Sequence, residues 1–242
     1  MPTPSPVTVR PYRAEDRQAI REICWQTAFM GQPMDFMYTD RESWVDLFTR
    51  YYTDREPEGC FVAENASGEV IGYLLGASDT RKLIFSYAQV ALRHLLLRGV
   101  LLRPGSARFW WRLAWDVLTD RVRKPTYEHH RYPAEMHINL LAEGRASGAA
   151  RDLVMAWYAH LRSQGVRGGW GSVLADNERS LRFLEKCGYS RVGEPYLVPG
   201  MRRPDGGRLH AQHVLFDVPP LNDCSHNASN RPATQAVTSG GN

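Results

Sequence analysis

Cysteine is scarce in this chain, and its spacing fits neither a metal site nor a redox pair. The 242 residues contain four cysteines, Cys24, Cys60, Cys187 and Cys224, with no C-x-x-C pair. A chain of this length can bury enough apolar surface to fold without disulfides. We therefore expect no metal site and no disulfide framework.

Long uncharged apolar segments are lacking as well. The chain starts with "MPTPSPVTVRPYRAED", which is proline-rich and then charged, so no secretory signal is visible. The apolar run from Leu83 to Leu102 is interrupted by Arg93, His94 and Arg98, which argues against a membrane-spanning helix. These absences favour a cytoplasmic location without a transmembrane segment.

The chain does have an ordinary globular composition with a mild excess of positive charge. Hydrophobic residues make up 43% and charged residues 23%, and the formal net charge is +4. These fractions are typical of a folded globular protein. The positive balance suits an anionic ligand, although a solvated basic surface is the simpler explanation. No nucleic-acid partner is expected on this ground alone.

Hydrophobic periodicity predicts one domain over residues 7–218. Residues 1–6 and 219–242 lack apolar periodicity, so both segments are expected to be disordered. Between them, alternating and helical patterns follow in the order β-α-α-β-β-(insert)-β-α-β-α-β-β. Strands are expected near 7–12, 60–77, 134–141, 168–175, 190–198 and 208–218, and helices near 14–29, 41–53, 149–164 and 177–189. This order predicts an α/β (α+β) fold with a mixed sheet.

Residues 80–125 differ from the rest and are expected to form an inserted, basic helical hairpin. Two helical patterns are separated by a break at Arg103, Pro104 and Gly105, and arginine and lysine heavily outnumber Asp116 and Asp120. The simplest interpretation is a helical pair that packs a Leu and Trp stripe on the sheet. An amphipathic surface that contacts a membrane or a partner is the alternative.

The stretch "LLAEGRASGAARDLVMAW", residues 140–157, contains the strongest chemical signal. Nothing bulky or β-branched occurs between Gly144 and Ala150, where a strand passes into a helix. Consecutive N–H groups at a helix start, together with the helix dipole, form a site for a phosphate group. A plain turn of small residues is the alternative. A P-loop or a Rossmann loop is excluded because their glycine and lysine spacings are missing.

Two motifs resemble the GNAT superfamily of acyl-CoA N-acyltransferases. The family pattern [Q/R]-x-x-G-x-[G/A] matches "RASGAA", from Arg145 to Ala150. The second pattern, N-x-x-[A/S]-x-x-[L/F]-Y-E-K-x-G-[F/Y], matches "NERSLRFLEKCGY", from Asn177 to Tyr189, except that Leu184 replaces the tyrosine. The segment "YPAEMHINLLAEGR", residues 132–145, also resembles the acetyltransferase-like domain of O-GlcNAcases and its stand-alone bacterial relatives.

The resemblance implies the GNAT fold, a mixed and mostly antiparallel sheet flanked by helices, and acetyl-CoA as co-substrate. It implies that the pyrophosphate lies on the N–H groups between Arg145 and Arg151 and that the pantetheine arm lies along a strand edge. Asn177 is also a candidate N-cap of its helix, and Phe183 a candidate core residue. The implied cofactor-binding residues are Ile138, Asn139, Leu140, Arg145, Ala146, Ser147, Gly148, Ala149, Ala150, Arg151, Asn177, Ser180 and Phe183.

The resemblance further implies direct attack of an amine on the thioester, which requires a base and an oxyanion donor. Glu135 and His137 lie two residues apart on one strand face, so either could act as the catalytic base directly or through water. A solvated glutamate and a hydrogen-bonded interior histidine are the non-catalytic alternatives. His129 and His130 are weaker candidates. A backbone N–H between Asn139 and Leu141 is expected to face the oxyanion.

Leu184 leaves the function open between two classes. Leucine cannot protonate a departing thiolate, although Tyr127, Tyr132 or Tyr189 could substitute, and the thiol is already a tolerable leaving group. We expect an N-acetyltransferase that acts on a primary amine, on a small molecule or a protein lysine. A pseudo-acetyltransferase that binds acetyl-CoA without turnover is the alternative. No motif specifies the acceptor or an oligomeric state.

Overall fold

A computed structural model describes residues 7–119, 127–145 and 147–220. The predictions for residues 1–6 and 221–242, for the end of the inserted hairpin and for Ala146 lie outside these described residues. Within them, the order of helices and strands agrees with the order expected from the sequence.

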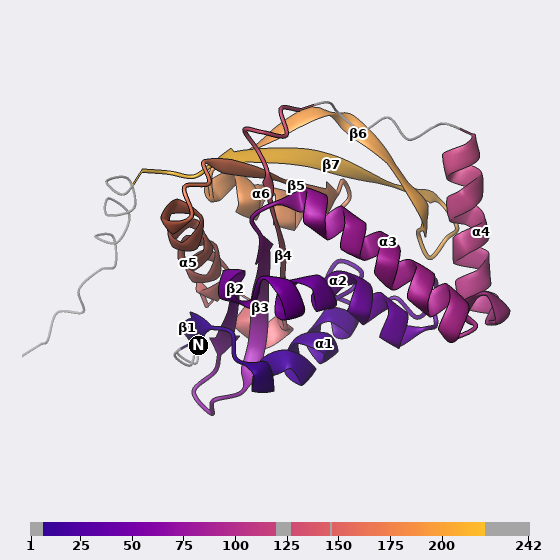
Figure 1. The fold of residues 1–242 in the computed structure, drawn as a ribbon, viewed down its shortest axis with the longest axis horizontal. Helices are drawn as coiled ribbons and strands as arrows, with labels where there is room; N and C mark the ends of the chain where they lie inside the picture. The colour runs from indigo at the N-terminus through magenta and orange to yellow at the C-terminus, as the bar shows by residue number, and fades with distance from the viewer. Residues whose placement is uncertain (1–6, 120–126, 146, 221–242) are drawn as a thin grey trace, which may run out of the picture.

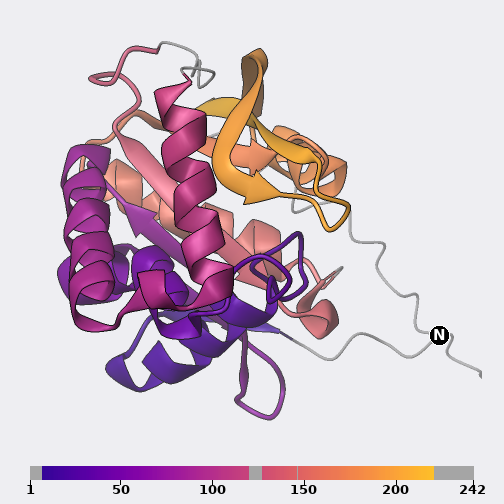
Figure 2. The ribbon, with the colours of Figure 1, turned by 90° about the vertical axis from the view of Figure 1, so that its right-hand side faces the viewer.

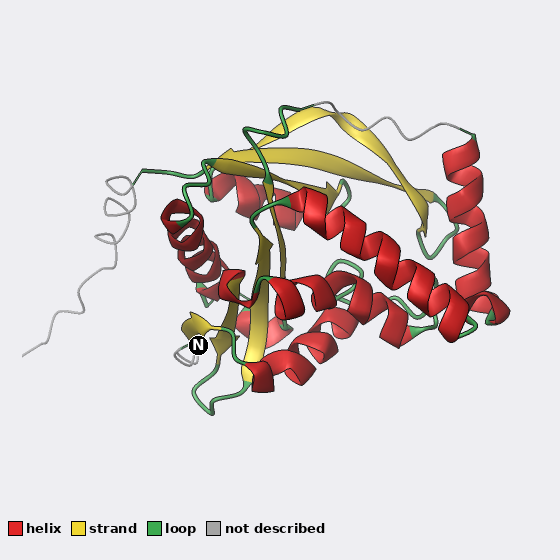
Figure 3. Cartoon of the chain, in the orientation of Figure 1, coloured by secondary structure: helices red, strands yellow, loops and turns green. Residues whose placement is uncertain are grey.

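One mixed sheet runs through the described part of the chain (Figure 3). Its strand order is β1-β2-β3-β4-β5-β7-β6, and every pairing is antiparallel except that of β4 with β5. This confirms the predicted mixed and mostly antiparallel sheet. The strands are β1 (Thr8–Pro11), β2 (Cys60–Glu64), β3 (Val70–Ala77), β4 (Ala134–Leu140), β5 (Gly168–Leu174), β6 (Tyr189–Arg202) and β7 (Arg208–Asp217).

Helices cover both faces of this sheet (Figures 1 and 2). On one face, α1 (Arg17–Gln26) and α2 (Arg41–Arg55) bury Ile20, Ile23 and Tyr52 against Tyr73 of β3. On the other, α5 (Ala149–Ser163) and α6 (Glu178–Lys186) pack beneath the strands. The helical spacing of their apolar residues explains why each helix buries one stripe.

Local sequence sets where these helices begin. The Asp40 side chain accepts a 2.9 Å hydrogen bond from the Ser43 N–H and caps α2. Gly148 precedes α5 with φ of +93°, a conformation that L-residues rarely adopt. The second of these junctions, before α5, borders the candidate site.

The parallel strands β4 and β5 are paired only at one end. Ala134 pairs with Gly169 and Glu135 with Trp170, and beyond this point the strands separate. Because Gly169 has no Cβ, the strands approach closely here; a side chain would collide with the Ala134 carbonyl and the Phe216 ring. From Met136 onward, the β4 edge that faces β5 therefore has no strand partner in the described part of the chain, while the other edge pairs with β3 as far as Leu140.

The insert forms two helices, α3 (Thr80–Leu97) and α4 (Pro104–Leu118), as predicted. Polar contacts fix it to the domain: His94 Nε2 lies within hydrogen-bond distance, 2.9 Å, of Oδ2 of Asp46 on α2, and Arg202 of β6 forms a 2.8 Å ion pair with Asp116 of α4. The prediction that its Leu and Trp stripe packs on the sheet is wrong for much of that stripe. Only one side of each helix contacts the domain, and side chains such as Trp111 stay exposed.

Candidate functional site

A cleft of about 410 Å³ lies where β4 and β5 separate. β4 forms one wall, residues 171–174 of β5 and the start of α6 form another, and residues 27–31 of the loop after α1 close one end. Nine of the residues predicted to act in catalysis or cofactor binding line it: His137, Ile138, Asn139, Leu140, Arg145, Ala150, Asn177, Ser180 and Phe183.

The loop before α5 presents backbone donors next to this cleft. The amides of Arg145, Ala149 and Arg151 already donate to Ala142 O, Ser147 Oγ and Gly148 O, respectively. Among the described residues, the amides of Ser147, Gly148 and Ala150 have no acceptor. A Cβ added to Gly148 would meet no atom within 4 Å, so the approach to these amides is open. Three donors at a helix start suit an anion.

The Arg145 side chain has a positioning role that the sequence did not reveal. Its guanidinium donates to Gly31 O at 3.1 Å and to Leu140 O at 3.3 Å, which ties the α5 loop to the loop after α1. Gly31 has a positive φ of +89°, and a side chain there would collide with Arg145. Sequence analysis missed Thr27 and Ala28 because only the tertiary fold brings them to the cleft.

The start of α6 combines a cap with a cleft surface. Asn177 Oδ1 accepts a 3.2 Å hydrogen bond from the Ser180 N–H, so the predicted N-cap is present, and Asn177 also lines the cleft. Arg179, which sequence analysis overlooked, lines the cleft as well. It also lines a surface hollow with Glu178, Arg182 and Lys186, in which Arg182 pairs with Glu178. Arg179 therefore adds a positive charge to the wall of the cleft.

His137 is the predicted base that reaches the cleft. Its ring lies 5.5 Å from the Phe48 ring, centroid to centroid, and its Nε2 lies 3.2 Å from Asn139 Nδ2. Burial lowers the pKa of His137 to about 4, although the backbone of Phe48 opposes this shift. The imidazole is therefore neutral near pH 7 and able to accept a proton.

Glu135 lies on the same strand face but does not line the cleft. It sits where β4 still pairs with β5, and its Oε2 accepts a 2.6 Å hydrogen bond from the Tyr52 hydroxyl. Burial raises the pKa of Glu135 to about 7, and the hydrogen bond from Tyr52 partly opposes the rise. A carboxyl group tuned in this way can take up or release a proton at neutral pH.

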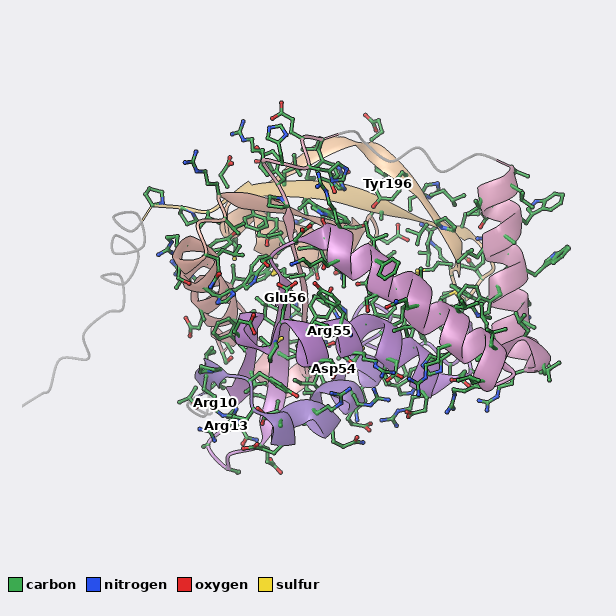
Figure 4. The ribbon with its side chains drawn as sticks, viewed as in Figure 1. Arg10, Arg13, Asp54, Arg55, Glu56 and Tyr196 are labelled. Carbon is green, nitrogen blue, oxygen red and sulfur yellow. The ribbon has the colours of Figure 1, made fainter. Side chains whose placement is uncertain are left out.

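Of the three tyrosines predicted to substitute for the family tyrosine that Leu184 replaces, Tyr189 lines the cleft and the other two do not. Leu184 and Tyr189 line the cleft, and burial raises the pKa of Tyr189 well above its ordinary value. Tyr127 instead packs against Trp170 with tilted rings, 5.7 Å between centroids, and does not line the cleft. Sequence analysis missed Tyr196 on β6 (Figure 4), whose hydroxyl lies 2.6 Å from Oγ of Ser172 in the cleft wall. Tyr132, His129 and His130 do not line the cleft either.

The inserted hairpin does not fill the cleft, because none of its described residues lines it. A second cavity of about 190 Å³ lies instead between α2, the hairpin and β6. Its lining is mostly apolar and includes Trp44, Phe48, Phe109 and Trp110. Phe48, one of the lining residues, also contacts the His137 ring.

Comparison with known proteins agrees with this geometry. Residues 17–189 match the model of the acetyltransferase (GNAT) family. The chain belongs to this family. Its members are acyl-CoA N-acyltransferases, so the chain is assigned to that enzyme class. The finer resemblance to the domain of O-GlcNAcases is not confirmed and stays a prediction.

Solved structures share the fold at low sequence identity. The crystal structure of SsHAT is 23% identical over 88% of this chain and 99% of its own, with a TM-score of 0.60. An N-acetyltransferase from Staphylococcus aureus Mu50 is 17% identical over 89% and 100%, with a TM-score of 0.55. The yncA protein from Salmonella typhimurium, solved with its cofactor acetyl-CoA, is 15% identical over 89% and 96%, with a TM-score of 0.55.

The sequence predicted neither a metal site nor a membrane-spanning helix. No group of three or more His, Cys, Asp or Glu side chains in this part of the chain is placed to hold a metal ion. Among the same residues, no helix has both the length and the apolar character needed to cross a membrane.

Proposed function

We propose that this GNAT protein transfers an acetyl group from acetyl-CoA to a primary amine by direct attack. The observation that carries the proposal is the separation of β4 from β5, which leaves an unpaired strand edge beside the amides of the α5 start. An amide-bearing arm can pair with such an edge as an added strand would. Acetyl-CoA supplies the activated acetyl group as a thioester.

The binding residues follow from this arrangement. The amides of Ser147, Gly148 and Ala150 would hold the pyrophosphate at the positive end of α5. Ile138, Asn139 and Leu140 would hold the pantetheine arm, with Phe183 packed beside it. The retained sequence predictions for Arg145, Ala146, Ala149, Arg151, Asn177 and Ser180 complete this set, with Arg145 fixing the loop through its side chain.

Strand geometry reduces the number of backbone amides of β4 that could donate a hydrogen bond to the oxyanion. The Leu141 amide, one of the groups expected from sequence, already donates to Ile71 O at 2.8 Å on the β3 side. Because successive residues of a strand turn their amides to opposite edges, Ile138 and Leu140 present theirs toward the open side. We assign the oxyanion contact to one of these two amides.

His137 is proposed as the base in contact with the acceptor amine. It lines the cleft and is neutral, so its imidazole can accept the proton that the amine loses on attack. Glu135, on the same face and with a pKa of about 7, is proposed to take up that proton through water. A general base contributes about 10²–10⁴-fold to a rate of this kind.

The acceptor is proposed to carry an apolar or aromatic group. Phe48 lines the aromatic cavity of about 190 Å³, and its ring also lies 5.5 Å from that of His137, so the cavity adjoins the proposed base. An apolar cavity of about 150 Å³ is large enough to hold benzene. A phenylethylamine should therefore have a lower KM than an aliphatic amine of similar basicity, and Phe109→Ala should reduce that difference.

Calorimetric titration with acetyl-CoA tests the binding site. The wild type should bind, and Gly148→Trp should weaken binding at least about tenfold by covering the amides. Gly206→Trp is the matched control, because Gly206 also has a positive φ, of +88°, and open space around it, but lies in the β6–β7 turn. Absence of binding by the wild type, or equal loss in both variants, contradicts the proposal.

An acetyl-CoA-binding protein without turnover is the second candidate, and Leu184 favours it. Release of the free thiol on addition of an amine panel separates the two candidates. Binding with amine-dependent thiol release supports the enzyme. Binding without thiol release for any amine supports the non-catalytic protein.

A further inference from the structure

The inserted hairpin exposes an unusual amount of apolar surface. Eleven of the thirteen large apolar side chains exposed among the described residues lie between Ile84 and Leu118. Leu102 is 87% exposed, Leu97 is 74% exposed and Trp111 is 72% exposed. We call these eleven residues the hairpin surface: Ile84, Phe85, Leu92, Leu96, Leu97, Leu101, Leu102, Trp111, Trp115, Val117 and Leu118. Large apolar side chains exposed in such number on one segment indicate a surface that contacts a protein partner or a membrane.

The hairpin surface is separate from the side of each helix that contacts the domain. On α3, Phe85, Leu92 and Leu96 recur at helical spacing and are exposed, whereas Leu83, Val90 and His94 are buried. On α4, Trp111, Trp115 and Leu118 recur in the same way, opposite the buried Phe109 and Asp116. α4 stands at the end of the molecule away from α5, and α3 runs toward it from the middle of the molecule (Figures 1 and 2).

The charge around this surface is almost entirely positive. Residues 80–118 contain seven arginines and lysines and a single acid, Asp116, which is buried and paired with Arg202. Arg81, Lys82, Arg93 and Arg108 are exposed and have no acidic partner among the described residues. A second copy of the same surface would bring like charges together, so charge disfavours self-association through this face.

We propose that the hairpin surface binds anionic lipid bilayers. Leucine, phenylalanine and tryptophan side chains would enter the boundary between headgroups and acyl chains, and the surrounding arginines and lysines would contact anionic headgroups. The helices would lie in the interface rather than cross the bilayer. None of the described hairpin residues lines the cleft between β4 and β5, so this inference stands independently of the proposed function.

Vesicle flotation tests the proposal with the full-length chain. The protein should float with vesicles of phosphatidylcholine and phosphatidylglycerol in equal parts, and much less with phosphatidylcholine alone. Raised salt should reduce flotation because it screens the headgroup charge. Insertion should also shift the fluorescence of the exposed Trp111 and Trp115 to shorter wavelength, and Trp111→Phe/Trp115→Phe should lose this shift.

Two test variants and one control variant separate the contribution of the apolar side chains of the hairpin from that of its positive charges. Leu96→Ser/Leu97→Ser/Leu101→Ser/Leu102→Ser changes exposed side chains only and should weaken vesicle binding at least about tenfold. Arg81→Glu/Lys82→Glu should also weaken it about tenfold or more. Arg55→Glu/Arg167→Glu changes the net charge equally at exposed sites outside the hairpin and should keep most of the binding. Circular dichroism verifies that each variant is folded.

Two results would overturn the proposal. One is a wild type that floats with neither vesicle, or equally with both at all salt concentrations. The other is a dimer in sedimentation equilibrium that the four-serine variant dissociates, since a second copy then covers the hairpin surface.

Discussion

The Tyr52 hydroxyl donates a 2.6 Å hydrogen bond to Oε2 of Glu135 and so joins the C-terminal end of α2 to the first half of β4. The Tyr87 hydroxyl of α3 lies 3.2 Å from that of Tyr52, so the carboxyl group stands at the end of a short polar chain inside an aromatic layer. Burial in this layer raises the pKa of Glu135 to about 7. Two predictions concern this carboxyl group.

The first is a pH dependence of the reaction. If Glu135 takes up the proton of the amine, kcat/KM should rise as the carboxyl ionises and should level off above about pH 7. Glu135→Gln should lose this step in the profile. Measuring both enzymes on the same amine cancels the titration of the amine itself. Profiles of the same shape in both would show that His137 acts without Glu135.

The second is a pH dependence of stability. Between its ordinary pKa of 4.5 and its folded value of about 7, Glu135 binds a proton more tightly in the folded state, so the free energy of unfolding falls as pH rises through this window. Glu135→Gln removes that loss, on the order of 2 kcal/mol. Relative to wild type, the variant should therefore gain stability between pH 5 and pH 8.

Urea denaturation at both pH values measures this difference, and the shared contribution of His137 cancels in it. Glu143→Gln, at an exposed loop position, is the control and should show no such trend. An equal difference between Glu135→Gln and wild type at both pH values would show that the carboxyl group is not buried in this way.

His137→Gln tests the base that lines the cleft. Glutamine keeps a polar side chain beside Asn139 but cannot take up a proton, so kcat should fall about 10²–10⁴-fold. Acetyl-CoA affinity by calorimetry should change little. His210→Gln, at an exposed position of β7, should keep wild-type kcat. A kcat for His137→Gln within a factor of about three of wild type would exclude His137 as the base.

Leu184→Tyr tests the departure from the family pattern. Leu184 lines the cleft, so a phenol at this position can donate a proton to the departing thiolate. We expect kcat to rise about tenfold, while Leu184→Phe, with a ring but no hydroxyl, should show no gain. Steady-state thiol release measures both. Equal rates in the two variants would show that protonation of the thiolate does not limit the reaction.

Asn177 has two roles that different substitutions separate. Asp is as good an N-cap as Asn, so Asn177→Asp should keep the stability of the domain, whereas Asn177→Ala should lose about 1 kcal/mol. The added negative charge of Asn177→Asp in the cleft should weaken acetyl-CoA binding severalfold. Thermal unfolding and calorimetry measure the two effects. Unchanged affinity in Asn177→Asp would place the bound co-substrate away from α6.

Much of the fold could be predicted because its signals are local. The helical spacing of Ile20, Ile23 and Cys24 indicated α1, and the run of small residues up to Ala150 indicated a loop that passes into α5. Each signal depends on neighbours within a few residues, so it is visible without the tertiary structure. The burial of the hairpin was predicted less well, because periodicity identifies an apolar face but not what covers it.

The candidate site, like the fold, was predicted only where its signals are local. Alternation along β4 predicted that Glu135 and His137 share a face, yet only His137 reaches the cleft, since the strands part just after Glu135. The position at which the strands separate depends on the close approach of Gly169 in β5 to Ala134 in β4, which are far apart in sequence. The contact of Gly31 with Arg145 depends likewise on where the loop after α1 packs.

The sequence by itself determined the order of the elements, the open backbone at Gly148 and the absence of a tyrosine at position 184, since each is a property of a short segment. Only the tertiary structure decided which backbone amides at the start of α5 have no acceptor. It also decided that His137 rather than Glu135 lines the cleft, and in which direction burial shifts the pKa of each. These properties depend on desolvation and on contacts between distant segments, and no short segment specifies either.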